Sequence, residues 1–92
     1  MSEPRTLKER AVASIGDVEV GVANIMEDRY VLPDGSTTSG MTAELIPLER
    51  PEDNVRHTVG AGSVVAIGGV RVEVLEVREG AFGDGRVSIR EL

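Results

Sequence analysis

The sequence predicts a small all-β domain, either an antiparallel β-sandwich or a partly open β-barrel of about seven or eight short strands. Apolar and polar residues alternate strictly over 70–74 (VRVEV), between glycine turns at 68–69 (GG) and 80–85 (GAFGDG). Such alternation between Gly-Gly and Asp-Gly turns is typical of antiparallel hairpins. Strands recur about every ten residues, and no segment is long enough for a helical crossover between parallel strands.

The N-terminal part allows two interpretations. Residues 1–5 are predicted to be disordered. The segment 6–9 (TLKE) has the spacing of a helical capping box, and Gly16 could end such a helix. Residues 11–18 (AVASIGDV) are equally typical of a strand that enters a Gly-Asp turn. Because a helix of about ten residues is marginal by itself, we favour a strand for 6–15.

The remaining strands follow from the same alternation, with turn residues between them. Pro33-Asp34-Gly35 predicts a turn, because proline presets φ, aspartate bonds locally and glycine takes the left-handed position. Pro47 ends one strand, and a charged loop follows at 49–54. The segment 75–77 continues the alternation of 70–74 one residue out of phase. The predicted strands after residue 15 are 18–22 with an extension to Ile25, 30–32, 41–46, 55–59, 64–67, 70–77 and 86–90.

The composition indicates one domain, 1–92, with a core of small side chains. Hydrophobic residues make up 40% of the chain and charged residues 28%, which is typical of a folded domain. Valine occurs 14 times, whereas Tyr30 and Phe82 are the only aromatic residues. Aromatic side chains bury the most area, and a domain of this length buries only about 60–65% of its unfolded surface. We therefore expect modest stability as a monomer, or support from a partner chain.

Charge and cysteine content narrow the classes of function. The chain has no cysteine, which excludes disulfides, thiolate catalysis and cysteine-ligated zinc. Its N-terminal segment is polar, so we expect neither a signal peptide nor a transmembrane helix, and a cytoplasmic location. The net charge is −6, and the sequence lacks the basic runs and aromatic residues of nucleic-acid binders. Neither nucleic acid nor a membrane is therefore an expected partner.

No constellation of catalytic or metal-binding residues stands out. His57 is the only histidine, and alternation places it on the same side of its strand as Val59, which favours a structural role. A general acid–base pair of His57 with Tyr30 or an acid is the minor alternative. One histidine and no acidic cluster with calcium-loop spacing predict no metal and no cofactor. The glycines at 60–62 and 80–85 lack the lysine and the following helix of a phosphate loop, so we interpret them as turns.

Nine of the ten basic residues are arginines, and three of these are the candidate partner-binding residues: Arg71, Arg86 and Arg90. They would lie on one side of the last hairpin if Val72 and Val87 point inward. One interpretation pairs them with Glu73 and Glu76 across the strands of a solvated face. The other is an anion-binding ridge, since arginine recognises anions through two parallel hydrogen bonds.

The order of segments 55–77 and 16–22 resembles small all-β domains that are common in actinobacteria. Those domains have a core of strand, Val-Gly-Asp, strand, Gly-Gly and strand near the C-terminus, and 16–22 (GDVEVGV) is similar to their second strand. This chain departs from them at Ala61-Gly62, where aspartate is usual, and at Val72, where tryptophan is frequent. The resemblance implies an all-β fold without an assigned activity, and it assigns no site residues.

The absence of catalytic groups and a core of small side chains favour a non-enzymatic protein-interaction or accessory module. It would act through a sheet face or an unpaired edge strand, and a homodimer is the simplest case. The alternative is a small-ligand-binding protein with an apolar pocket between valine-rich sheets, because small side chains can leave a cavity. A third alternative is that the protein is a component of a structural lattice.

Overall fold

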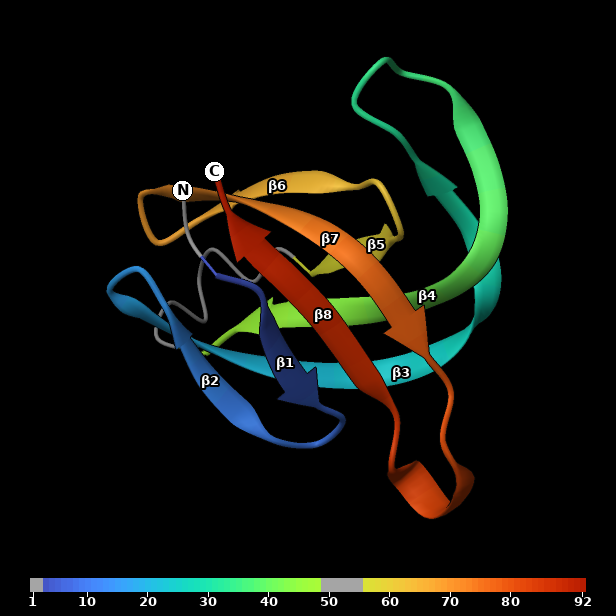
Figure 1. The fold of residues 1–92 in the computed structure, drawn as a ribbon, viewed down its shortest axis with the longest axis horizontal. Helices are drawn as coiled ribbons and strands as arrows, with labels where there is room; N and C mark the ends of the chain where they lie inside the picture. Colours follow the sequence, from blue (N-terminus) through green and yellow to red (C-terminus); the bar gives the residue numbers. More distant parts are fainter. Residues whose placement is uncertain (1–2, 49–55) are drawn as a thin grey trace.

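The computed structural model describes residues 3–48 and 56–92, which form two four-stranded antiparallel sheets (Figure 1). One sheet has the strand order β1-β8-β7-β6 and the other β2-β3-β4-β5. The predicted all-β class is confirmed as a sandwich, and the described strands do not close into a barrel. The strands are β1 (Arg5–Lys8), β2 (Val12–Ile15), β3 (Val18–Val31), β4 (Thr37–Pro47), β5 (His57–Gly60), β6 (Val64–Ile67), β7 (Val70–Arg78) and β8 (Arg86–Glu91).

Two short corners pass the chain from one sheet to the other. The first, after β1, has Arg10 in a left-handed conformation (φ 68°), with its N–H donating to the carbonyl of Val22 at 2.8 Å. The second, between β5 and β6, is closed by Ser63, whose Oγ accepts from the N–H of Gly60 at 3.0 Å. The strand interpretation of 6–15 is confirmed, but the corner divides it into two strands. Arg5, predicted to be disordered, is the first residue of β1 and pairs with Ile89.

The predicted strands 18–22 and 30–32 are parts of one long strand, β3, which pairs with β4 along its length. A bulge between Ala23 and Met26 interrupts the register, and Asn24 there has a φ of 51°. This bulge breaks the alternation, which is why the sequence suggests two separate strands. The turn at 33–35 is confirmed, and β4 begins at Thr37 rather than at residue 41. The predicted loop at 49–54 and Val55 lie outside the described residues.

The slip in alternation within 70–77 is a second bulge. The register of β7 against β8 shifts between Val74 and Glu76. Both Val74 and Val77 are therefore buried, although they are three residues apart. Glu73 and Glu76 point outward on the other face for the same reason.

The core lies between the two sheets and consists of aliphatic side chains. Neither aromatic residue belongs to it: Tyr30 is buried against the end of β5, and the side chain of Phe82 is fully exposed. The core residues are Leu7, Ile15, Val20, Val22, Ala43, Leu45, Val59, Ile67, Val72, Val74, Val77, Val87 and Ile89.

Candidate interaction surfaces

The outer face of the β1-β8-β7-β6 sheet contains the three arginines that the sequence singles out. Val72 and Val87 are buried, so Arg71, Arg86 and Arg90 point outward on the same face, as expected from alternation. The structure does not gather them into one ridge. Arg86 is the first residue of β8, next to the β7–β8 turn. Arg71 lies at the other end of the sheet, where its backbone carbonyl accepts the N–H of Leu92.

Arg90 has a carboxylate partner on the neighbouring strand. Its Nη2 donates to Oε1 of Glu73, the residue directly opposite on β7, and both side chains are about one-third exposed. This contact agrees with the interpretation as a cross-strand charge pair. Glu73 partly neutralises the guanidinium of Arg90, which makes Arg90 a weaker site for a further anion. Arg71 has no such contact with any carboxylate of residues 3–48 and 56–92.

The strand register instead places two other basic residues beside Arg86. Lys8 on β1 lies directly opposite Arg86 on one side, and Arg78 on β7 lies directly opposite it on the other. We call Lys8, Arg86 and Arg78 the cationic row. Side chains paired in this way have Cβ atoms about 5 Å apart, and like charges at that spacing repel each other. All three are exposed, so the repulsion is partly screened by water.

The cationic row is incompletely neutralised. Arg78 pairs with Glu76 on its own strand, and Nη2 of Arg86 is 3.8 Å from Oδ1 of Asp84. These four side chains are between 44% and 73% exposed, and exposed pairs of this kind contribute only about 0–1 kcal/mol. Carboxylates of a partner could therefore replace both contacts at little cost.

The second candidate surface is the ribbon formed by the far halves of β3 and β4. β2 pairs with β3 only as far as Gly21, and β5 pairs with β4 only as far as Thr42. The ribbon beyond these residues curls away from the two sheets and is visible at the upper right of Figure 1. No other described strand pairs with either of its edges.

The hydrogen-bond phase of the ribbon indicates which of its backbone groups point away from it. The N–H of Leu32 donates to the carbonyl of Ser36 at 2.8 Å, which makes Tyr30–Thr38 a hydrogen-bonded pair. Every second residue is then bonded within the ribbon, and the residues between them direct N–H and C=O groups away from it. On the β4 edge these outward residues are Thr37, Ser39 and Met41.

The two edges of the ribbon differ in charge. The β3 edge has three consecutive charged residues, Glu27, Asp28 and Arg29. The β4 edge, Thr37–Met41 (TTSGM), has none, and its neighbours Ser36 and Thr42 are also uncharged. Charged side chains protect a sheet edge from unwanted strand pairing, so the β3 edge is protected and the β4 edge is open.

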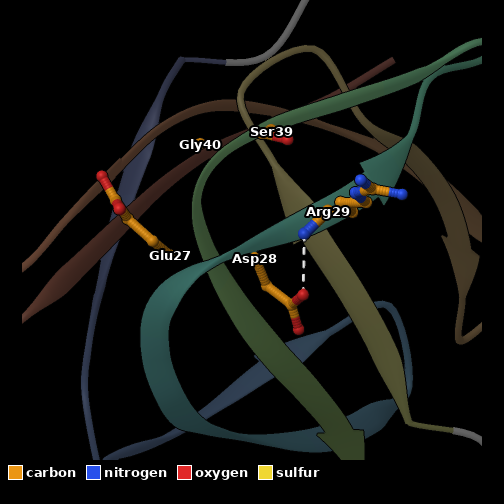
Figure 2. A pocket seen from close by; sticks show the side chains of 5 residues that line it. All are labelled: Glu27, Asp28, Arg29, Ser39 and Gly40. Atoms are coloured by element: carbon orange, nitrogen blue, oxygen red, sulfur yellow. Dashed lines mark hydrogen bonds between the residues drawn. The ribbon is translucent and has the colours of Figure 1, made fainter.

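An open depression of about 330 Å³ lies on the ribbon and is lined by Glu27, Asp28, Arg29, Ser39 and Gly40 (Figure 2). Its three charged side chains point in different directions rather than toward one centre. The only hydrogen bond drawn among the lining residues is local, from the N–H of Arg29 to Oδ1 of Asp28 at 2.8 Å. The residues that line the depression belong to the ribbon, so it does not lie between the two sheets.

His57 is half-buried on the core side of β5, opposite Leu45 and two residues before Val59. Burial lowers the pKa of this imidazole below its ordinary value of 6.5. Within the described ranges, no group of three or more histidine, aspartate or glutamate side chains is arranged to hold a metal ion. Nor does the described part of the chain include a helix that is long and apolar enough to cross a membrane.

Comparison of the chain with protein-family models, curated proteins and solved structures finds no match. The resemblance of 55–77 to actinobacterial all-β domains therefore stays a prediction.

Sequence reasoning misses the most informative members of both surfaces. Lys8 lies opposite Arg86 because the first strand pairs with the last, and no local pattern in the sequence indicates that pairing. The edge at 37–41 is missed because its alternation is weak. A signal for it does exist: a turn at 33–35 should be followed at once by a strand, and Thr37-Thr38 is a β-branched pair.

Proposed function

We propose that this protein is a protein-interaction module that accepts an extended segment of a partner along the Thr37–Met41 edge of β4. The supporting observation is an uncharged edge without a neighbouring described strand, next to an opposite edge that three charged residues protect. Strand addition to such an edge provides main-chain hydrogen bonds whatever the partner's sequence. Three residues of this edge, Thr37, Ser39 and Met41, offer an N–H and a C=O each.

The length of the edge favours an isolated strand over a second copy of this chain. β5 occupies the place beside β4 from Thr42 to Leu45, so the free edge ends at Met41. If two β4 strands paired antiparallel with Ser39 on a two-fold axis, Ser36 of the second copy would lie level with Thr42. Gly60 already pairs with Thr42, so the hairpin tip of the second copy would meet the end of β5. An extended segment that is not part of a hairpin avoids this collision.

The test removes one outward N–H from the edge. Replacing Ser39 with proline deletes a donor that the ribbon itself does not use, whereas Ser39→Ala keeps that donor and serves as the matched control. Wild-type, Ser39→Ala and Ser39→Pro chains are used as baits in an extract of the source cells, and retained proteins are quantified by mass spectrometry. We expect partners that wild type and Ser39→Ala retain and Ser39→Pro loses.

Hydrogen exchange of the purified complex then locates the contact. The proposal requires the Ser39 amide to become protected when the partner binds. It is contradicted if all three baits retain the same proteins, or if protection appears elsewhere and not at Ser39. Light scattering of the free chain separates the homodimer case, because a dimer formed through this edge would dissociate in Ser39→Pro and persist in Ser39→Ala.

A further inference from the structure

The turn between β7 and β8 exposes one of the only two aromatic residues of the chain. Phe82 has φ 57° and ψ 35°, Gly83 has φ 77°, and the N–H of Asp84 donates to the carbonyl of Ala81 at 3.2 Å. These are the features of a type I′ turn with phenylalanine at its first central position, where asparagine, aspartate or glycine is usual. The Phe82 side chain is fully exposed, so packing within the described structure does not compensate for this conformation.

The turn lies beside the cationic row. β7 ends at Arg78 and β8 begins at Arg86, so the loop of Phe82 starts and ends next to two members of the row. The corner after β1 also contacts this loop: the N–H of Glu9 donates to the carbonyl of Gly85 at 2.9 Å. The guanidinium of Arg10 lies against Gly83. An exposed aromatic ring and four basic side chains therefore belong to one end of the molecule.

This end is less acidic than the rest of an acidic chain. It holds four basic residues, Lys8, Arg10, Arg78 and Arg86, and four acidic ones, Glu9, Glu76, Glu79 and Asp84. The rest of the chain holds six basic and twelve acidic residues. Glu9 Oε1 is occupied by the N–H of Gly85, and Glu76 and Asp84 pair with Arg78 and Arg86. Three of its four carboxylates are therefore already engaged, and an acidic ligand with an apolar group suits the basic side chains beside Phe82.

We infer that the Phe82 turn and the cationic row form a second docking surface, for an acidic peptide segment of another protein that packs an apolar side chain against Phe82. Carboxylates of the segment bind Lys8, Arg86 and Arg78 in place of the weak contacts that Glu76 and Asp84 make. Aromatic and arginine side chains dominate the energetics of protein interfaces, which suits this pairing. The inference is independent of the β4 edge, since the two hairpin tips point to opposite sides of the molecule (Figure 1).

The test uses a random-peptide phage library panned on the full chain, followed by affinity measurements with the enriched synthetic peptides. We expect enriched peptides to be acidic and to contain a large apolar residue. Phe82→Asn should weaken them about tenfold or more, because it removes the apolar anchor and keeps a residue that tolerates the left-handed turn. Arg86→Gln should weaken binding several-fold. Added salt should lower the peptide affinity of wild type by a larger factor than that of this variant.

Arg71→Gln is the matched control, because it removes the same charge from the same sheet face at the other end. It should bind the peptides like wild type, and the thermal midpoint of Phe82→Asn should not fall. The inference is overturned if no acidic peptide is enriched, if Phe82→Asn binds normally, or if Arg71→Gln and Arg86→Gln lose affinity equally. Phe82-dependent binding to phosphatidylserine vesicles without peptide binding would assign the surface to a membrane and would also overturn it.

Discussion

Gly16 and Gly68, which begin the turns of two hairpins in opposite sheets, lie backbone against backbone. Both have a φ of 60°, and a Cβ atom on Gly16 would overlap the carbonyl of Gly68. A Cβ atom on Gly68 would in turn overlap the carbonyl of Ile15. The β2–β3 and β6–β7 turns therefore approach as closely as they do only because both positions lack a side chain.

The neighbouring Gly69 provides the control for this contact. It also has a positive φ, 80°, but a Cβ atom there would meet open space. We expect Gly69→Ala to cost about 1 kcal/mol from backbone strain, and Gly68→Ala about 3 kcal/mol because the turns must also separate. Urea unfolding of the two variants measures the difference. Equal losses would show that conformational strain alone accounts for both.

The ring of Tyr30 covers Gly60 and ties the curled ribbon to the start of the β5–β6 corner. Its hydroxyl donates to the carbonyl of Ala61 at 2.8 Å, and a Cβ atom on Gly60 would overlap the ring. We expect Gly60→Ala to destabilise the fold by about 2 kcal/mol through overpacking, and Tyr30→Phe by about 1 kcal/mol through the lost hydrogen bond. Gly40→Ala is the control for thermal unfolding, because its Cβ would lie 3.7 Å from the same ring, an ordinary contact.

Native-state hydrogen exchange should follow the alternating phase of the β3–β4 ladder. The amides of Thr38 and Gly40 bond to β3, whereas that of Ser39 points away from it. After correction for sequence, we expect the Ser39 amide of the free chain to exchange about tenfold or more faster than both neighbours. Uniform protection across 38–40 would mean that something already covers this edge, and it would remove the basis for strand addition.

The stability of the domain should depend on pH through His57. Its pKa is lowered from 6.5 in the folded state by burial, so the unfolded chain binds the proton more readily. The contribution of neutral His57 to the free energy of unfolding is therefore fully present above pH 6.5. It is lost as the pH falls through the lower folded-state pKa. Urea unfolding from about pH 8 to about pH 5 should show this decline, and His57→Gln should flatten it. A wild-type curve that is flat in this range contradicts the burial effect.

Sequence patterns locate most strands and turns because the signals for these elements lie within a few neighbouring residues. Alternation locates β6, β7 and β8, and the slip at 75–77 is the bulge between Val74 and Glu76. The turn at 33–35 forms because of residue types that act within three or four positions. β3 is the exception, since a bulge with a left-handed Asn24 breaks its period in the middle of a continuous strand. The sequence pattern then suggests an end where the backbone continues.

The sequence by itself determined that this chain is a sheet protein with outward-pointing arginines on its last hairpin, since side-chain period and turn chemistry are properties of neighbouring residues. Only the tertiary structure decided which charges meet. Pairing of the first strand with the last brings Lys8 beside Arg86. The register of β7 against β8 places Glu73 opposite Arg90, and the two side chains form an ion pair. The unpaired β4 edge is likewise a matter of where β5 stops. Registers between strands distant in sequence are set by packing of the whole core, which no local pattern encodes.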